Sequence, residues 1–229
     1  MSEKKIAVAL DGPSGSGKST LAKNISKKLG YVYIDTGALY RTIGLYVCEH
    51  GVASDDREGI IALLPEIKIS MRLEDGGGKV YLGDKRIGNE IRTPVISKYA
   101  SDVSKVPEVR AFLLETQRSI ARENDVVMDG RDIGTVILPG AQVKIFVTAS
   151  PEARAKRRYA ELTERGENVS YEEVLKDMVW RDANDRNREV APAVAAPDAV
   201  LLDNTGLDVE GTLDAALEII KKRLCEAEK

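Results

Sequence analysis

The sequence predicts an α/β protein in which helices cover both faces of a parallel sheet. Three observations predict this class: short β-rich runs recur along the chain, helical patterns separate them, and the runs are apolar on both faces. The five runs are IAVAL (6–10), YVYI (31–34), VVM (126–128), VKIFV (143–147) and AVLL (199–202). Runs that alternate with helices favour parallel strands, so we expect these runs to form a parallel sheet.

Helix signals occupy the intervals between these runs. Ser150–Pro151 combines a preferred N-cap residue with a proline at the first helical position. Ser170 and Glu173 have the spacing of a capping box, which marks another helix start. Apolar residues at three- and four-residue spacing over 209–224 predict a final amphipathic helix.

One segment breaks the alternation of strands and helices. Apolar residues alternate with polar ones from Ile67 to Leu73, and Gly76–Gly78 and Gly83–Asp84 supply turns. This pattern predicts a small antiparallel meander. Because a parallel sheet does not easily absorb such a meander, we expect an insertion over about residues 65–100.

Composition limits the classes of function. The 229 residues fit one domain, and 43% apolar with 31% charged residues is typical of a soluble globular protein. With 34 Lys and Arg against 37 Asp and Glu, the overall charge favours neither nucleic acid nor membrane partners. A near-neutral, self-contained fold makes a monomer the expectation.

The two cysteines and the absence of export signals suggest a cytoplasmic protein. Cys48 and Cys225 lie far apart without metal-ligand spacing, so we expect two reduced, partly buried thiols. No apolar stretch has the length of a signal peptide or a membrane span.

The glycine-rich turn after the first run has a specific chemistry. Residues 12–19, GPSGSGKS, satisfy the pattern G-x-x-x-x-G-K-[ST], with a strand before and the helical segment 21–30 after. Backbone N–H groups of such a loop converge on phosphate oxygens at a helix N-terminus. Lys18 can reach the β- and γ-phosphates, and Ser19 can offer a hydroxyl to Mg²⁺. The alternative is an ordinary Gly/Ser turn, which would not require a preceding strand and a following helix in register with the motif. The predicted triphosphate-binding residues are Gly12, Pro13, Ser14, Gly15, Ser16, Gly17, Lys18, Ser19 and Thr20.

A regulatory GTPase is the main rival among triphosphate-binding proteins. Such proteins carry an N-K-x-D motif that reads guanine, and this sequence has none. The switch class is therefore disfavoured. The donor base is left without an identified reader, so ATP is the donor by default.

Arginines cluster beyond the glycine-rich turn. The clusters are DTGALYR (35–41), DGRDIGT (129–135), EARAKRRY (152–159) and WRDANDRNR (180–188). Arg154, Arg157 and Arg158 have the spacing of one helix face. A second helical stripe turns from apolar to charged along Val174, Met178, Arg181, Asp185 and Arg188. Solvated surfaces with local Arg–Asp pairs are the plain alternative for each cluster taken singly.

Several arginines together suggest a second anion, a phosphorylated acceptor. The planar guanidinium binds two phosphate oxygens at once and stays charged. A phosphate monoester has a second pKa near 6, so it is largely dianionic at neutral pH and needs no general base. The lone His50, near a helix end, is accordingly expected on the surface.

With these segments the chain resembles the bacterial cytidylate kinases, a family of nucleoside monophosphate (NMP) kinases. The resemblance covers essentially the whole chain, including IRTPVISKYASDVSKVPEVR, DGRDIGTVILPGA and RDANDRNREVAP. It implies a P-loop NMP-kinase fold: a five-stranded parallel sheet flanked by helices, a small antiparallel β insertion and a helical lid. It also implies ATP- and Mg²⁺-dependent phosphorylation of CMP and dCMP to CDP and dCDP by in-line transfer, in pyrimidine nucleotide metabolism. A P-loop kinase of UMP or another small acceptor is the alternative.

The resemblance also implies how one kinase domain, 1–229, is divided. The core would comprise 1–64, 101–149 and 171–229. An NMP-binding insertion would span about 65–100, and a mobile lid about 150–170.

Residue roles follow from the resemblance position by position. The implied acceptor-binding residues are Thr36, Arg41, Ser101, Arg110, Arg131, Asp132, Arg181, Asp185 and Arg188. Of these, Arg41, Arg131 and Arg188 would hold the monophosphate. Ser101, Arg110 and Asp132 would read cytosine, whose N4 donates and whose N3 and O2 accept. Arg181 and Asp185 would meet the ribose. Thr36 stands where many relatives have serine, so the hydroxyl is kept.

The catalytic set would offset charge on the transferred group. It comprises Lys18, Arg131 and the lid arginines Arg154, Arg157 and Arg158. Mg²⁺ would be held by Ser19 and, through water, by Asp129. Asp35 also follows a strand-like run, but a structural role at its turn is about as plausible.

Overall fold

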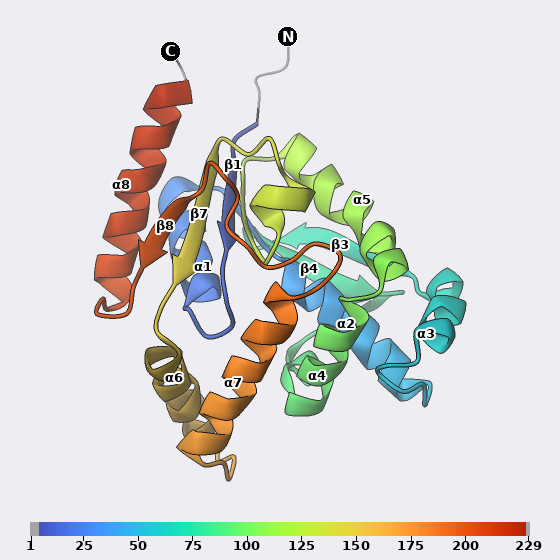
Figure 1. Cartoon of the computed structure of the whole chain (residues 1–229). Coiled ribbons are helices and arrows are strands. Elements are labelled where there is room, and N and C mark those ends of the chain that lie inside the picture. Colours follow the sequence, from blue (N-terminus) through green and yellow to red (C-terminus); the bar gives the residue numbers. More distant parts are fainter. Residues whose placement is uncertain (1–4, 228–229) are drawn as a thin grey trace.

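The computed structural model describes residues 5–227. Over this part of the chain the strands form one continuous sheet in the order β3-β4-β2-β6-β1-β7-β8, with β5 paired to β4. Figure 1 labels β1, β3, β4, β7 and β8 of this sheet. The five strands that the apolar runs predict are parallel to one another: β1 (Ala7–Asp11), β2 (Val32–Asp35), β6 (Val126–Asp129), β7 (Val143–Thr148) and β8 (Val200–Asp203). A further strand, β4 (Gly77–Leu82), pairs with β2 in parallel at Tyr33 and Gly77. The predicted parallel arrangement of the five runs is confirmed.

Helices cover both faces of this sheet. They are α1 (Lys18–Leu29), α2 (Thr36–Glu49), α3 (Arg57–Leu63), α4 (Pro94–Val103), α5 (Pro107–Glu123), α6 (Pro151–Glu164), α7 (Tyr171–Arg186) and α8 (Val209–Ala227). Short turns are η1 (Leu64–Glu66), η2 (Asn89–Arg92) and η3 (Ile133–Ile137). One core cluster packs α1 and α8 on one face, and another packs α5 and η3 on the other. The α/β class is therefore confirmed. Because helices bury the strands on both faces, the strands need apolar residues throughout, as the predicted runs have.

Four of the parallel strands end on an aspartate. These residues are Asp11, Asp35, Asp129 and Asp203. Each predicted run stops one residue before its aspartate, because the runs are defined by apolar residues and a carboxylate is not apolar. The carboxyl edge of the sheet is therefore polar although its centre is not.

The capping signals are confirmed. The Ser150 hydroxyl accepts a hydrogen bond from Ala153 N at 3.2 Å, and the full capping box forms at Ser170 and Glu173. Helix α7 ends at Arg186, so the expected continuation of its stripe to Arg188 is wrong. Arg188 lies in the loop beyond the helix.

The antiparallel meander is present but it joins the sheet. It consists of β3 (Ile69–Glu74), β4 (Gly77–Leu82) and β5 (Lys85–Arg86). Tyr33 N donates to Gly76 O at 3.2 Å, which attaches the β3–β4 hairpin to the free edge of β2. The expectation that the sheet would not absorb the meander is therefore wrong, since an edge strand still offers unpaired backbone groups. Helix α4 continues past residue 100 to Val103.

The cysteine expectation is half right. Both thiols are free; Cys48 is partly buried in α2, whereas Cys225 is exposed on α8. His50 follows α2, exposed, with its ring stacked on Tyr46 at a centroid distance of 4.0 Å. In the part of the chain described here, every helix is too short or too polar to cross a membrane.

Candidate functional site

A cavity of about 700 Å³ lies at the carboxyl edge of the sheet. Residues directly after three strands line it: Thr36 after β2, Gly130 after β6 and Asn204 after β8. Central strand β1 lies between β6 and β7, so the flanking connections diverge to opposite sides there. Open α/β sheets bind ligands at this kind of switch point.

Side chains hold three carbonyl groups of the loop after β1. Lys18 Nζ donates to Pro13 O at 2.6 Å, Arg154 Nη1 to Ser14 O at 2.8 Å, and Asn204 Nδ2 to Ser16 O at 2.9 Å. With its carbonyls held by side chains, the loop presents N–H groups as an anion cradle. Residues Ser14–Thr20 line the cavity, whereas Gly12 and Pro13 do not.

Gly12 shapes this loop without lining the cavity. Its φ is +143°, and a Cβ atom there would lie 2.0 Å from Val147 O. Only glycine allows the loop to pass this close to β7. Gly17, with φ at +81°, then precedes α1, whose N-terminus points at the cradle.

Lys18 is buried at the base of the cradle, 5% exposed. Burial and the nearby Arg131 lower its pKa well below the usual value. An ammonium group held under such conditions is stabilised by an anion placed beside it.

Three oxygen-bearing side chains meet beside Lys18. Ser19 Oγ donates to Asp129 Oδ2 at 2.6 Å, and Tyr33 OH donates to Asp129 Oδ1 at 3.2 Å. Burial, reinforced by the Asp35 carboxylate, raises the pKa of Asp129 to about 6. A hydroxyl and a carboxylate are the oxygen donors that Mg²⁺ prefers. Among residues 5–227 no cluster of three His, Cys, Asp or Glu could hold a metal by itself, so phosphate and water would complete this shell.

The cavity is strongly basic although the chain is not. Of the described residues, eleven basic and six acidic side chains line it, whereas the whole chain has a formal charge of −3. Local clustering, and not overall charge, therefore makes the cavity attractive to anions.

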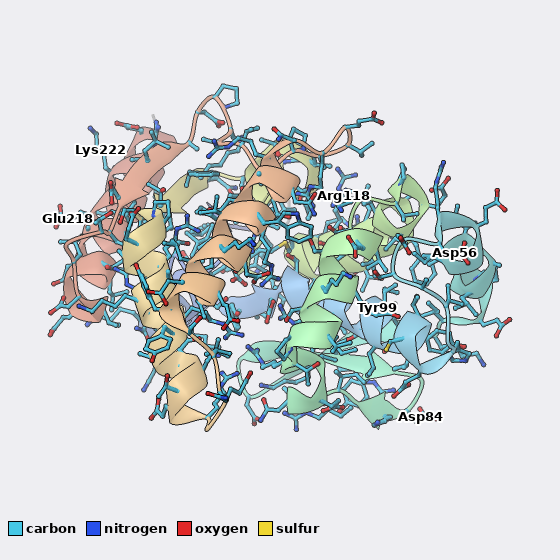
Figure 2. All side chains as sticks on the ribbon, turned by 60° about the horizontal axis from the view of Figure 1, so that its bottom comes forward. Asp56, Asp84, Tyr99, Arg118, Glu218 and Lys222 are labelled. Atoms are coloured by element: carbon cyan, nitrogen blue, oxygen red, sulfur yellow. The ribbon has the colours of Figure 1, made fainter. Side chains whose placement is uncertain are left out.

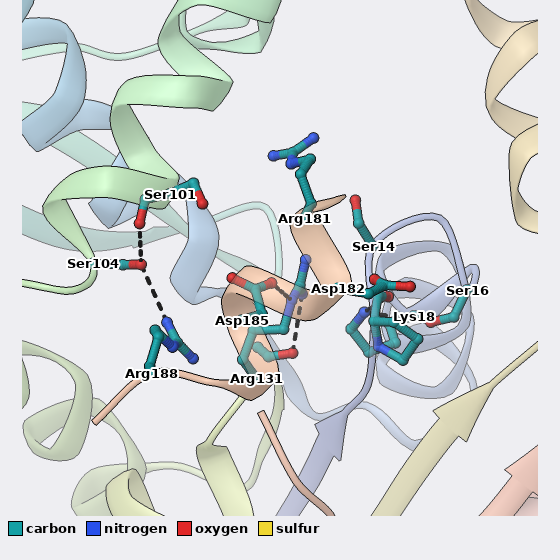
Figure 3. A network of polar contacts seen from close by, with 12 residues as sticks. Ser14, Ser16, Lys18, Ser101, Ser104, Arg131, Arg181, Asp182, Asp185 and Arg188 are labelled. Atoms are coloured by element: carbon teal, nitrogen blue, oxygen red, sulfur yellow. Dashed lines mark hydrogen bonds and ion pairs between the residues drawn. The ribbon is translucent and has the colours of Figure 1, made fainter. Parts of the chain in front are cut away.

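The wall opposite the cradle is assembled by α4, α5 and the loops after β6 and α7. Buried Arg110 pairs with buried Asp132, and Arg110 Nη1 donates to Ser104 O at 3.2 Å. Arg188 Nη1 donates to Ser104 Oγ at 3.1 Å, and Ser104 Oγ donates to Ser101 O at 2.8 Å (Figure 3). Ser104 thus joins three of the predicted acceptor residues.

Several buried polar atoms in this wall and on neighbouring α2 lack partners within the described residues. They are Ser101 Oγ, Arg188 Nε, Arg188 Nη2 and Arg41 Nε. Burial lowers the pKa of Arg188, which shows how poorly its charge is solvated. Buried donors without partners are costly, so these atoms mark where a polar ligand would be held.

The predicted ribose and phosphate residues lie between the wall and the cradle. Arg131 Nε donates to Asp185 Oδ2 at 3.0 Å (Figure 3), and Arg181 Nη2 donates to Ser97 O at 3.4 Å. Arg181 and Asp185 share the cavity side of α7, as their helical spacing predicts.

A third group lies at the start of α2. Arg41 Nη2 donates to Asp35 Oδ2 at 2.8 Å, and Arg92 Nη2 lies 3.5 Å from the same oxygen. Asp35 also caps α2 through Ala38 N at 3.0 Å. The Thr36 hydroxyl donates to Asp129 O at 2.8 Å, so only its lone pairs remain for a ligand.

The three arginines of α6 point to different places, which differs from the single basic face that their spacing predicts. Arg154 is buried, donates to Ser14 O and Ala149 O, pairs with Asp182, and does not line the cavity. Arg157 donates to Asn204 Oδ1 at 3.1 Å and Asn204 O at 2.8 Å. Arg158 pairs with Glu161 at 3.1 Å. Arg157 and Arg158 line the cavity.

The structure adds lining residues that the sequence reasoning missed. They include Tyr40, Arg92, Ser97, Ser104, Arg165, the loop residues Leu207 and Asp208, and Val209 and Thr212 at the start of α8. Residues of the segment 207–212 line the same cavity as the cradle, and a donor base bound there would need a reader. The only sequence signal of this segment is that it follows the β8 strand after a short connection.

Comparisons with known proteins agree with this geometry. The family model described as "Cytidylate kinase" matches residues 8–222. A cytidylate kinase of Thermosipho melanesiensis is 50% identical, covering 94% of this chain and 97% of its own. A cytidylate kinase of Caldicellulosiruptor bescii is 46% identical, covering 96% of this chain and 97% of its own. A gluconokinase structure from Sinorhizobium meliloti matches with 15% identity and a TM-score of 0.49, over 96% of this chain and 94% of that one, which is too weak to bear on activity.

Proposed function

The chain belongs to the cytidylate kinase family, and from this membership we infer that it transfers the γ-phosphoryl group of ATP to CMP and dCMP. The products are CDP and dCDP. One observation carries the proposal: a single basic cavity joins a triphosphate cradle to a wall of buried, unpartnered donors. Two anions can therefore be held face to face, as phosphoryl transfer requires.

We propose that cytosine lies against the wall formed by Ser101, Arg110 and Asp132. The carboxylate of Asp132 accepts from cytosine N4, and the guanidinium of Arg110 donates to the ring acceptors. The Arg110–Asp132 pair already exists without ligand, so both groups are held in place before the base arrives. The unpartnered Ser101 Oγ adds a further polar contact.

The phosphate and ribose of the acceptor fit between the wall and the cradle. Arg41, Arg131 and Arg188 supply forks for the phosphate, and the free Nε and Nη2 of Arg188 support its assignment. Arg181 and Asp185, on the cavity side of α7, are placed to meet the ribose hydroxyls. Thr36 Oγ1 is available as an acceptor.

The triphosphate of ATP is assigned to the backbone of Ser14–Thr20 and to Lys18. Family membership implies ATP use, and the segment 207–212 is the candidate cover for its base. The oxygens of Ser19 and Asp129 fit Mg²⁺, with Asp129 acting through water. When bound, Mg²⁺ supplies charge neutralisation at the β- and γ-phosphates.

The mechanism is in-line transfer between two fixed anions. The acceptor phosphate is already dianionic, so no base is needed, and positioning supplies most of the rate. Lys18, Arg131 and the α6 arginines Arg157 and Arg158 offset charge as the phosphoryl group moves. Arg154 is assigned a different part, holding the cradle through Ser14 O and α7 through Asp182.

We assign the lid to about residues 150–170, the hairpin that α6 forms before α7. Figure 1 shows α6 and α7 projecting beyond the carboxyl edge of the sheet. Closure over both substrates would exclude water and protect ATP from hydrolysis. The NMP-binding insertion at about 65–100 is proposed on the same basis, since Arg92 and Ser97 of this segment line the cavity.

The test is a panel of acceptors with ATP and Mg²⁺, read as ADP release. CMP and dCMP should be turned over, whereas UMP should react poorly because its O4 accepts where cytosine N4 donates. Preferred turnover of UMP or of a sugar acceptor would replace the proposal by the alternative kinase. ATP hydrolysis as fast without CMP as with it would contradict the mechanism. A GTP-dependent affinity for a partner protein would instead favour a switch.

The setting of the enzyme is proposed separately. A monomeric cytoplasmic enzyme of pyrimidine nucleotide metabolism is supported by the near-neutral overall charge and the free thiols. Sedimentation of the purified chain tests the monomer.

A further inference from the structure

A rare element directly follows Arg131 and Asp132. The turn η3 is π-helical: Ile137 N donates to Asp132 O at 3.2 Å and Leu138 N to Ile133 O at 2.7 Å, both spanning five residues. π-helical turns are uncommon and are often found at functional sites. The turn lines no part of the cavity, so its contribution must act through its neighbours.

A buried carboxylate holds the beginning of this turn. Asp11 Oδ1 accepts from Ile133 N and Asp11 Oδ2 from Gly134 N, each at 2.8 Å. Asp11 is 4% exposed, and burial raises its pKa to about 6 although these two amides stabilise its charge. A Cβ atom at Gly134 would lie 3.4 Å from Asp11 Oδ2 and 3.1 Å from Lys144 Cδ, so the approach is close.

A guanidinium holds the end of the same turn. Arg118 Nε donates to Ile137 O and Arg118 Nη2 to Val136 O, each at 2.9 Å. Arg118, labelled in Figure 2, lies on α5, two turns after Arg110. A carboxylate on the first amides and a cation on the last carbonyls both match the polarity of the turn.

The turn limits where Asp132 can be. Its carbonyl accepts from Val136 N at 2.9 Å as well as from Ile137 N, so its backbone belongs to the turn. Its carboxylate is meanwhile paired with Arg110. A shift of the turn would therefore move the carboxylate relative to Arg110, and Arg131 with it.

We propose that Asp11 and Arg118 are positioning residues for the acceptor: by holding η3 at both ends they fix Asp132 and Arg131 in the wall of the cavity. The inference rests on the proposed function, since it assigns a support to the same acceptor site. Neither residue contacts the substrate. Asp11 also joins the two halves of the site, because the loop that carries the cradle begins at the next residue, Gly12.

The test compares two variants with matched controls. Asp11→Asn places an amide against an N–H donor, and Arg118→Gln removes the paired donors. Asp56→Asn alters a carboxylate that also accepts a helix-start amide, but on distant α3. Arg122→Gln removes an exposed arginine one turn further along α5. Calorimetry gives the Kd of CMP and of a non-hydrolysable ATP analogue, steady-state kinetics give the CMP:UMP ratio of kcat/KM, and hydrogen exchange follows peptide 131–138.

Asp11→Asn should raise the Kd of CMP about tenfold and lower the CMP:UMP ratio, with the Kd of the ATP analogue unchanged. Arg118→Gln should act in the same direction, and Arg118→Lys, which keeps one donor, should restore part of the loss. Exchange across 131–138 should rise about tenfold in both altered variants and in neither control.

Unchanged exchange in both variants would overturn the inference whatever the acceptor is. Faster exchange with unaltered CMP affinity and selectivity would overturn it too, as would an equal loss of ATP-analogue binding. If Asp11→Asn does not fold, the surface-accessible Arg118 variants decide the matter alone. A wild-type chain that neither binds nor phosphorylates CMP would overturn the proposed function. The exchange data would still test whether Asp11 and Arg118 hold η3 in place.

Discussion

The two sides of the cavity are built in different ways. The proposed donor cradle is one contiguous stretch, Ser14–Thr20, held by local backbone geometry. The proposed acceptor wall draws Ser101, Arg110, Asp132 and Arg188 from four separate segments and depends on ion pairs and one shared serine. A contiguous cradle needs few supports, whereas an assembled wall is only as precise as the contacts between its parts.

Removal of the cradle lysine gives the largest expected effect. Lys18→Ala should lower kcat about a thousandfold, because a donor that acts on the transferred group is lost. The Kd of CMP should stay near that of the wild type if the two sides are independent. Rapid-quench kinetics and calorimetry measure the two quantities, with Lys27→Ala, exposed on the same helix, as the control. If CMP binding weakened as much as kcat fell, the cradle and the wall would not be independent. Retained turnover would contradict the assignment of Lys18 to the cradle.

Removal of the wall carboxylate should act mainly on selectivity. Asp132→Ala removes the acceptor for cytosine N4 and should lower the CMP:UMP ratio of kcat/KM about thirtyfold. Binding of an ATP analogue should change little. Asp102→Ala is a matched control, because Asp102 pairs with Lys105 and does not line the cavity. An unaltered ratio in a folded Asp132 variant would remove this residue from base recognition.

The residue that joins the two sides should be visible in the pH dependence of stability. The pKa of Asp11 is raised from 3.8 to about 6 in the fold, so its ionised form is disfavoured and stability falls as pH rises through that range. The unfolding free energy of Asp11→Asn relative to wild type should therefore increase by about 1.4 kcal/mol from pH 5 to pH 7.5. Urea titrations at both values measure it. A constant or decreasing difference would show that Asp11 is not a strained carboxylate.

The smallest effect is expected at the start of α7, far from its site residues. Ser170→Ala removes one half of a capping box and should lower the unfolding free energy by about 1 kcal/mol. The Kd of CMP should not change, because Arg181 and Asp185 lie near the other end of the helix. Thermal melts and calorimetry, with exposed Lys176→Ala as the control, check both parts. A raised Kd of CMP in Ser170→Ala would mean that the position of the acceptor-binding residues depends on the whole of α7.

The contrast also explains what the sequence could predict. The cradle and the five parallel strands depend on local spacing and on apolar runs, so both are legible in the chain. The apolar runs miss the strand ends at Asp11, Asp35, Asp129 and Asp203, because backbone pairing with the neighbouring strands, and not side-chain polarity, extends each strand to its aspartate. The attachment of the meander to β2 is likewise a tertiary event that alternation alone does not show.

The site residues follow the same rule. Helical spacing placed Arg181 and Asp185 together correctly, because both project from one side of α7. It failed for Arg154, whose long side chain turns towards Ser14 and Asp182 instead of joining Arg158. Ser104 and Arg118 carried no signal, since a serine or a helical arginine has no special pattern until its partners are known. Asp11 finds its amides 122 residues further along the chain.

The strand order has a consequence for the time course of synthesis. β1 leaves the ribosome long before its two neighbours in the sheet, β6 and β7, which begin only at Val126 and Val143. Contacts between segments so distant in sequence form slowly. The cradle residues therefore exist as a linear stretch long before anything holds them in place. The cradle is thus made well before the strands that support it, so a truncated chain ending before β7 would carry the phosphate-binding sequence without a phosphate-binding site.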